Sequence, residues 1–272
     1  MEHKSRKRRK IEIKPETLEQ IQQLSLMNNA FMNLALEDNI PCVEEVLRVI
    51  LGKSDLEVKT ARTQKMFQGF RRSIYLDIYV EDSKGTQYNI EIQQSNEGAD
   101  PRRVRFHMGM IDVHSLKAGQ DFRELPECYV IFITQEDVLG RGKTIYTIHK
   151  YIDDDLEAFN DGSHTIYING SAEDDGTEIW KLIHDFNCTK AEEMYLPKLS
   201  ARVKFLKEDE EGVSIVSDYF EERQAKAVEE AQKREKESLV LKLLEMGKLT
   251  LDEIAVCTGL TLKRVQMLAK TL

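Results

Sequence analysis

Hydrophobic and polar residues alternate strictly along residues 73–93, which read SIYLDIYVEDSKGTQYNIEIQ. A period of two predicts β-strands, and two such runs separated by a short loop with glycine predict a β-hairpin. Residues 83–85 form a three-residue loop, and Gly85 at its end suits the left-handed position of a favoured hairpin connection. Counting outward from this loop places Asp77 opposite Glu91, on the same face of the hairpin.

These paired carboxylates are the first candidate chemistry in the chain. Directly opposed side chains on neighbouring strands have Cβ atoms about 5 Å apart, so Asp77 and Glu91 would repel each other. A divalent cation with hard oxygen ligands would remove that repulsion. The alternative is an ordinary solvent-facing side of an antiparallel sheet, on which carboxylates are common. Spacing alone leaves both interpretations open.

The remaining pattern predicts a mixed α/β protein. Helical periodicity covers residues 16–36, 41–52, 101–117, 179–187 and 191–207, and strand-like runs cover residues 56–59, 128–134, 144–151 and 165–168. The continuous apolar run CYVIFIT at residues 128–134 is typical of a buried central strand. Pro41 and Gly52 suit the first turn and the end of the second helix.

The C-terminal part of the chain has a different pattern. Residues 212–246 form a long, highly charged helical stretch, which is typical of a spacer or of one half of a helical pair. Residues 249–268, LTLDEIAVCTGLTLKRVQML, predict a helix-turn-helix unit. Because its second helix offers only Lys263, Arg264 and Lys270, a packing or dimerisation hairpin fits at least as well as a DNA reader.

Composition bounds the class of protein. The chain has 272 residues, of which 41% are hydrophobic and 32% charged, as in soluble globular proteins. It has no apolar run near the roughly 20 residues of a membrane span and no signal-peptide pattern at its start, so we expect a cytoplasmic protein. The net charge is −9, yet residues 1–10 carry six Lys/Arg, and residues 1–14 are expected to form a disordered basic leader. A local basic surface for nucleic acid is compatible with the negative total.

Several segments together resemble the PD-(D/E)XK nuclease superfamily. Asp77 followed, on the next strand, by Glu91 and Gln93 is similar to its catalytic motif. Segments similar to its recombination-promoting nuclease (Rpn) branch, also described as transposases, are DPRRVRF (100–106) and residues 124–153, 159–170 and 181–188. The resemblance covers roughly residues 27–272. It implies a restriction-endonuclease-like mixed central sheet flanked by helices at residues 15–210, with a helical C-terminal extension at residues 211–272.

The resemblance also implies an activity, the Mg²⁺-dependent hydrolysis of DNA phosphodiesters in recombination or transposition. Asp77, Glu91 and the backbone carbonyl of Ile92 would hold the metal, which activates water and stabilises charge on the phosphate. Gln93 stands where most of the superfamily has lysine. A neutral amide can orient water or phosphate, but it supplies no positive charge.

Two further groups of residues are candidates. Arg102, Arg103 and Arg105 lie in the first turn of an expected helix, where the helix dipole prefers acids. Contacts to DNA phosphates and salt bridges to nearby acids explain this placement equally well. The resemblance implies a further acid on the preceding helix: helical phase favours Glu44, similarity to family sequences favours Glu45, and either could be a surface acid.

Two alternatives to a nuclease remain open. The chain could be a catalytically silent DNA-binding or regulatory protein with a nuclease-like fold, which the missing lysine would permit. It could also be an interaction protein whose C-terminal helices mediate assembly, including assembly into a homo-oligomer.

Overall fold

One mixed β-sheet forms the centre of the larger of two compact units, which extends to Ser217. The structure is a computed structural model that describes residues 13–69, 71–94 and 96–270. Within these residues the strand order is β1-β2-β3-β4-β6-β5. The strands are β1 (Val58–Phe67), β2 (Ile74–Asp82), β3 (Gln87–Gln93), β4 (Cys128–Thr134), β5 (Ile145–Ile148) and β6 (Ser163–Asn169).

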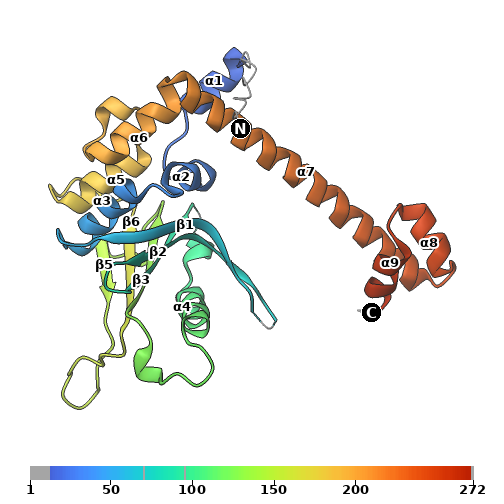
Figure 1. Cartoon of the computed structure of the whole chain (residues 1–272), viewed down its shortest axis with the longest axis horizontal. Helices are drawn as coiled ribbons and strands as arrows, with labels where there is room; N and C mark the ends of the chain where they lie inside the picture. Colours follow the sequence, from blue (N-terminus) through green and yellow to red (C-terminus); the bar gives the residue numbers. More distant parts are fainter. Residues whose placement is uncertain (1–12, 70, 95, 271–272) are drawn as a thin grey trace, which may run out of the picture. The chain divides into compact units, whose positions relative to one another are not determined.

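The sheet combines an antiparallel half with a parallel centre (Figure 1). Strands β1, β2 and β3 are antiparallel, β4 runs parallel to both β3 and β6, and β5 pairs antiparallel with β6 at the far edge. A parallel pair needs a crossover connection, and helix α4 (Pro101–Ser115) lies in the connection between β3 and β4. The predicted α/β class, a mixed sheet flanked by helices with a helical C-terminal region, is confirmed.

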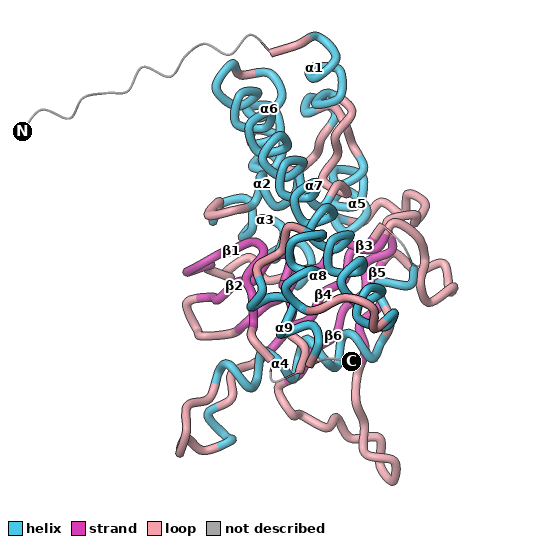
Figure 2. Tube along the Cα trace, turned by 90° about the vertical axis from the view of Figure 1, so that its right-hand side faces the viewer, coloured by secondary structure: helices cyan, strands magenta, loops and turns pink. Residues whose placement is uncertain are grey.

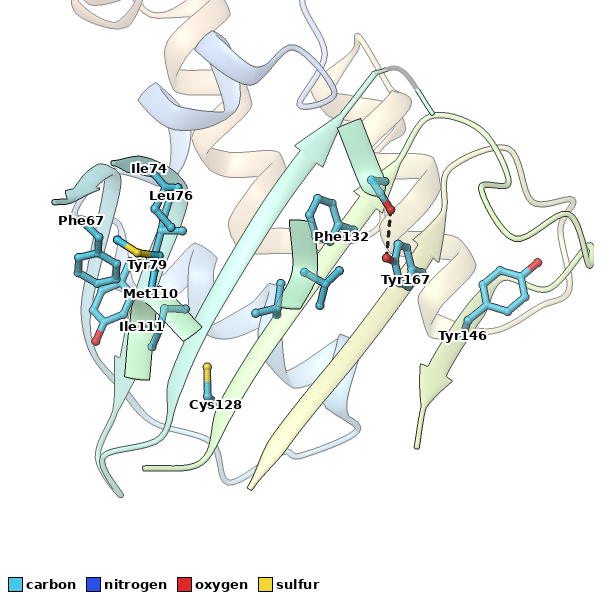
Figure 3. Packing of buried hydrophobic residues seen from close by; sticks show 13 residues of the cluster. Phe67, Ile74, Leu76, Tyr79, Met110, Ile111, Cys128, Phe132, Tyr146 and Tyr167 are labelled. Atoms are coloured by element: carbon cyan, nitrogen blue, oxygen red, sulfur yellow. Dashed lines mark hydrogen bonds between the residues drawn. The ribbon is translucent and has the colours of Figure 1, made fainter. Parts of the chain in front are cut away.

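Helices cover both faces of this sheet (Figures 1 and 2). Helix α4 packs on one face, where its Val104 and Ile111 belong to the same buried cluster as Val130 and Phe132 of β4. Figure 3 labels Ile111 and Phe132 of this cluster. The other helices of this unit are α1 (Pro15–Gln22), α2 (Asn29–Leu36), α3 (Ile40–Leu51), α5 (Glu178–Asn187) and α6 (Pro197–Glu208), with short 3₁₀ turns at Asn96–Ala99, Phe122–Glu124 and Ala191–Glu193. Alternate residues of β4 are apolar on both sides because helices cover both faces.

The hairpin prediction is confirmed in detail. Ile78 pairs with Ile90 and Val80 with Tyr88, so the register counted outward from the loop is the observed one. Gly85 has a φ of 85°, the left-handed conformation that the loop requires.

Three predicted segments need correction. The helix expected over residues 16–36 is two helices, because the Asn28 side chain accepts the N–H of Phe31 and begins α2 anew. The helix expected over residues 191–207 begins only at Pro197, which suits a first helical position. The strand expected at residues 56–59 is the start of the much longer β1.

A buried lysine ties several connections of this unit together. Lys207 of α6 is almost fully buried, and its ammonium group donates to the carbonyl oxygens of Gln22, Leu24 and Thr189. Burial lowers the pKa of Lys207 to about 8. Gln22 is the last residue of α1, Leu24 lies in the connection between α1 and α2, and Thr189 follows α5, so one side chain holds these segments against α6.

The smaller unit, from Asp218 onward, contains most of the long helix α7 (Glu210–Met246) and the helices α8 (Leu251–Thr258) and α9 (Leu262–Ala269). Its core consists of Val240, Ile254 and Val265, as expected for a helix-turn-helix unit. Arg264 of α9 is held by Glu237 of α7 at 2.8 Å. No helix in the described ranges is long and apolar enough to cross a membrane. Residues 1–12 of the expected basic leader lie outside the residues that the structure describes.

Candidate active site

A single row of side chains crosses the sheet at right angles to its strands. The pairing registers bring Glu91, Phe132, Tyr167 and Tyr146 of β3, β4, β6 and β5 into this row. Hydrogen bonds extend it to Asp77 of β2, which contacts Glu91, and to Gln64 of β1, which contacts Asp77. The row is polar over the first three strands and aromatic over the last three. The strand alternation that predicted the pairing of Asp77 with Glu91 therefore extends across the whole sheet.

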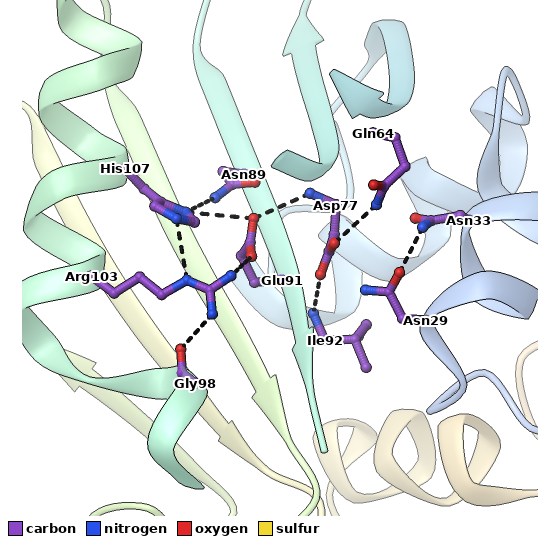
Figure 4. Close-up of polar contacts among 10 residues, drawn as sticks. All are labelled: Asn29, Asn33, Gln64, Asp77, Asn89, Glu91, Ile92, Gly98, Arg103 and His107. Atoms are coloured by element: carbon purple, nitrogen blue, oxygen red, sulfur yellow. Dashed lines mark hydrogen bonds and ion pairs between the residues drawn. The ribbon is translucent and has the colours of Figure 1, made fainter. Parts of the chain in front are cut away.

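Asp77 and Glu91 form a buried acid pair (Figure 4). The backbone N–H of Asp77 donates to Oε1 of Glu91 at 3.2 Å, and the backbone N–H of Ile92 donates to Oδ2 of Asp77 at 3.1 Å. The amide of Gln64 donates to Oδ1 of Asp77 at 3.1 Å. The solvent-facing alternative for these acids is wrong, because Asp77 is 8% exposed and Glu91 is fully buried.

Burial makes the ionised pair unfavourable. Loss of water raises the pKa of Asp77, and the negative charge of Glu91 raises it further. Hydrogen bonds from Asn29, from the N–H of Ile92 and from Gln64 offset only part of this shift. The Asp77 carboxyl is thus easier to protonate than an ordinary aspartate, as expected where two acids share a site without a cation.

Arg103 of α4 supplies a positive charge to this pair. Its Nη2 lies 3.1 Å from Oε2 of Glu91, and its Nη1 donates to the carbonyl of Gly98 at 2.9 Å. His107, one helical turn later, is buried with Nδ1 at 3.5 Å from Glu91, and it also contacts Asn89 and Arg103. Helix α4 therefore presents the cation of Arg103 to the buried carboxylate of Glu91 from the sheet face that it covers, at the left in Figure 4.

Three amide side chains complete the polar surroundings of Asp77, and sequence reasoning missed them. Asn29 and Asn33, four residues apart on α2, share one helix face and are hydrogen-bonded at 2.8 Å. Polar residues at this spacing in the otherwise apolar helix NAFMNLAL are the signal that could have found them. Gln64 carried no such signal: its φ of 50° is rare for a residue with a side chain, and such strain is common at functional sites.

Gln93 faces the same side of β3 as Glu91, as strand alternation predicts. Its amide lies tightly against Gly98, because a Cβ atom at that glycine would stand only 1.9 Å from Oε1 of Gln93. The same imagined atom would lie 3.5 Å from Nη1 of Arg103. The amide of Gln93, which stands at the lysine position of the superfamily, and the guanidinium of Arg103 therefore both lie beside the turn at Gly98.

A groove of about 1010 Å³ adjoins the acid pair along the start of β2 and the first turns of α4. Arginine and aromatic side chains dominate its lining, which includes Arg72, Tyr75, Arg102, Arg103, Arg105 and Phe106. The structure separates the three neighbouring arginines: the side chain of Arg102 is 85% exposed, Arg105 is exposed, and Arg103 is turned toward Glu91. Exposed guanidinium groups and aromatic rings are the side chains that bind phosphates and stack on bases.

Neither glutamate suggested for the preceding helix reaches the acid pair. Glu44 accepts the N–H of Val58 at 3.0 Å and binds Arg48. Glu45 accepts the first N–H groups of α6, at Lys198 and Leu199. Both side chains therefore have structural partners elsewhere, and α2 brings the amides of Asn29 and Asn33 to the site instead.

The donor set fits a magnesium ion. Mg²⁺ prefers hard oxygen ligands and is commonly bound by one or two carboxylates with several waters. The described residues contain no cluster of three His, Cys, Asp or Glu side chains for a metal, so the protein offers two carboxylates and neutral oxygens. Within the same residues, the buried Oδ1 atoms of Asn33 and Asn89 accept no hydrogen bond, and each lies beside the pair or its neighbours. These are polar groups that a hydrated ion could satisfy.

A mixed sheet with an acid pair on adjacent strands and helices on its faces is consistent with a PD-(D/E)XK fold. A family model described as "PD-(D/E)XK nuclease family transposase" matches residues 36–255, and the chain belongs to this family. No curated protein and no solved structure matches the chain. Membership indicates a nuclease or transposase-related role, with DNA as the expected partner.

Proposed function

We propose that the protein is a divalent-metal-dependent DNA endonuclease that hydrolyses phosphodiester bonds, with Mg²⁺ as the natural ion, in recombination or transposition. The observation that carries this proposal is the buried Asp77–Glu91 pair, in which the Asp77 anion is unfavourable. The pair lies behind Arg103 and His107, which contact Glu91 and line a basic groove. Family membership supplies the reaction class.

In this proposal each residue has a defined task. Asp77, Glu91 and the carbonyl of Ile92 hold the ion, which supplies an activated water and stabilises charge on the phosphate. Gln93 orients the water or a phosphate oxygen through its amide. Arg102 and Arg105 bind backbone phosphates, and together with Arg103 they make the groove basic.

The decisive experiment is a nicking assay on supercoiled plasmid DNA with the full-length protein. We expect open-circular and linear products with Mg²⁺ and none with EDTA. Asp77→Ala serves as the control for contaminating nucleases, because it removes one proposed ligand and should yield no product. Intact plasmid after incubation of the wild type with Mg²⁺ would favour the second candidate described next.

A catalytically silent DNA-binding protein is the second candidate, and one observation favours it. Arg103 already pairs with Glu91 at 3.1 Å, so one of the two acids has a counter-ion without a metal, and Gln93 brings no charge of its own. In that case the groove would bind DNA with the same affinity in Mg²⁺ and in EDTA once ionic strength is matched.

The C-terminal unit is proposed to mediate self-association rather than base reading. Its recognition-helix arginine, Arg264, is engaged by Glu237, and Val256 and Met267 are exposed. Gel filtration of the chain with and without residues 218–272 tests this, with a drop in oligomeric state expected on deletion. An unchanged oligomeric state would remove assembly as the role of this unit.

A further inference from the structure

The protein's own donors already occupy the acid pair. All four carboxylate oxygens already accept hydrogen bonds: the backbone N–H groups of Asp77 and Ile92 and the side chains of Gln64 and Arg103 each donate to a different oxygen. The side chain of Asn29 adds a further hydrogen bond to Asp77. Backbone N–H groups within paired strands are fixed, whereas side chains can rotate away. A cation that binds both acids meets the positive charge of Arg103 at Glu91, because Arg103 is the only charged one of these side-chain donors.

The side chain of Arg103 could also lie in the basic groove, away from Glu91. Its side chain is 38% exposed although Glu91 is fully buried, so the guanidinium stands at the boundary between the acid pair and the solvent. It also lines the groove in which Arg102 and Arg105 are exposed. Its other contacts are single hydrogen bonds to the Gly98 carbonyl and to His107 at 3.3 Å, and the guanidinium carbon lies 5.9 Å from the centre of the Phe132 ring.

We propose that Arg103 is a displaceable counter-ion that couples cation binding to nucleic-acid binding. It neutralises Glu91 while the acid pair is without a cation, and it turns into the groove to bind a backbone phosphate when a divalent cation takes its place. This inference rests on the proposed function and deepens it. Arg103 then supplies, from α4, the positive charge that Gln93 does not provide from β3.

The coupling works in both directions. Arg103 and the cation compete for Glu91, so the free protein binds the cation more weakly than the acid pair alone would. A phosphate in the groove draws Arg103 away and strengthens cation binding, and by linkage the cation strengthens phosphate binding by the same factor. The free protein would hold its metal loosely and the DNA complex would hold it tightly.

Calorimetric titration of the free full-length protein with Mg²⁺ tests the competition without any cleavage. Because a neighbouring opposite charge changes a carboxylate's affinity for a proton by about one to three pKa units, Arg103→Met should bind Mg²⁺ about tenfold more tightly, or more. Arg103→Lys keeps the charge and should stay close to the wild type. Arg102→Met is the matched control: it removes an arginine from the same turn that does not touch the acid pair, and its affinity should not change.

A purely structural role for Arg103 predicts the opposite sign. If Arg103 only holds the site together, Arg103→Met weakens Mg²⁺ binding or leaves it unchanged, and either result overturns the inference. The same titration of Asp77→Ala shows which part of the wild-type binding heat comes from Mg²⁺ at the acid pair. If that variant binds Mg²⁺ as the wild type does, the proposed metal site itself fails, which is a distinguishable outcome.

Thermal melting covers the case in which Arg103→Met is unstable. The substitution leaves Glu91 buried without its counter-ion, so we expect a lower melting temperature in EDTA. Added Mg²⁺ should then raise the melting temperature more than in the wild type, because stabilisation by a ligand grows with its affinity. A lower melting temperature with an equal or smaller response to Mg²⁺ contradicts the proposal.

DNA binding provides the second half of the test. Affinity for a short duplex is measured at constant ionic strength with Ca²⁺ and with EDTA, for the wild type, Arg103→Met and Arg102→Met. The cation should strengthen binding severalfold more in the wild type and in Arg102→Met than in Arg103→Met. Equal cation effects in all three proteins would show that Arg103 does not carry the coupling.

Discussion

Two aspartates near opposite ends of the same row of side chains are used in opposite ways. Asp77 lies within the row beside Gln64, and Asp137 is bound by Tyr146, which ends the row on β5. Asp137 accepts backbone N–H groups of the following loop and the Tyr146 hydroxyl, at 2.7 to 3.2 Å. Partial burial raises its pKa, but the Tyr146 hydroxyl and the loop N–H groups outweigh this and hold the pKa below its usual range.

The difference separates an acid that organises a loop from an acid suited to a site. Asp137 is stabilised as an anion by neutral donors from its own loop and gains little from a cation. Asp77 is buried opposite a second acid, and its raised pKa means that the anion is unfavourable until a positive charge arrives. Acidic residues in loops are therefore poor markers of function here, whereas a buried opposed pair is a strong one.

The largest expected effect comes from exchanging the two acids for uncharged residues. Asp77→Ala should abolish Mg²⁺-dependent plasmid cleavage while the fold remains, because a proposed ligand is lost and like-charge repulsion is relieved. Asp137→Asn should keep cleavage and lower stability by about 1–3 kcal/mol, since it weakens hydrogen bonds to a charged acceptor. Plasmid nicking and thermal melting of both variants measure the contrast. If Asp77→Ala cleaved plasmid DNA at the wild-type rate, Asp77 would not be a residue of the active site and the contrast with Asp137 would fail.

Gln93 should show the next largest effect. Gln93→Ala should slow single-turnover cleavage by about 10²-fold at saturating Mg²⁺, since one transition-state contact is lost, while metal affinity stays nearly constant. Gln93→Lys should be tolerated, because lysine occupies this position in most of the superfamily. Gly98→Ala should mimic Gln93→Ala, since its new methyl group would collide with the amide. Equal rates for the wild type and Gln93→Ala would remove Gln93 from the site.

The exposed arginines should affect binding more than chemistry. Replacing Arg102 and Arg105 by Ala should reduce the slope of log affinity against log salt by about 1.8, which corresponds to two phosphates on duplex DNA. Arg123→Ala is the control, because that exposed arginine is paired with Asp121 away from the groove lining. A slope that does not change in the double variant would place the DNA elsewhere on the protein.

The smallest effect is a pH-dependent change in stability. The pKa of Asp77 is raised from 3.8 to about 6, so the folded protein holds a proton there that the unfolded chain releases between pH 4 and 6. Its contribution to stability is therefore present at low pH and is lost as pH rises through about 6. Asp77→Asn should thus stabilise the metal-free protein by up to about 3 kcal/mol at pH 7.5 and have little effect near pH 4. Denaturant unfolding in EDTA measures both, and a pH-independent difference would contradict the raised pKa.

The sequence predicted what depends on local periodicity and turn chemistry. Strand alternation and Gly85 were sufficient for the hairpin register, and hence for the opposition of Asp77 and Glu91. The apolar run of β4 was sufficient for a central strand.

What it could not predict depends on contacts between distant segments. The partners of Glu44 and Glu45 follow from where β1 and α6 pack, not from helical phase. Arg102 and Arg103 are adjacent in the sequence, and only the position of α4 over β3 shows that Arg103 is the one that contacts Glu91. Gln64 enters the site through one unusual backbone angle, for which the sequence has no marker.

The buried ammonium of Lys207 has a practical consequence. With a pKa of about 8, a large fraction of this amine is uncharged and nucleophilic in mildly alkaline buffer, yet almost none of it is accessible. An acylating reagent would therefore modify exposed lysines at once and Lys207 only when the end of α1 at Gln22 and the segment at Thr189 move away from α6. The rate of its modification, followed by peptide mass spectrometry, therefore measures how often this part of the domain opens.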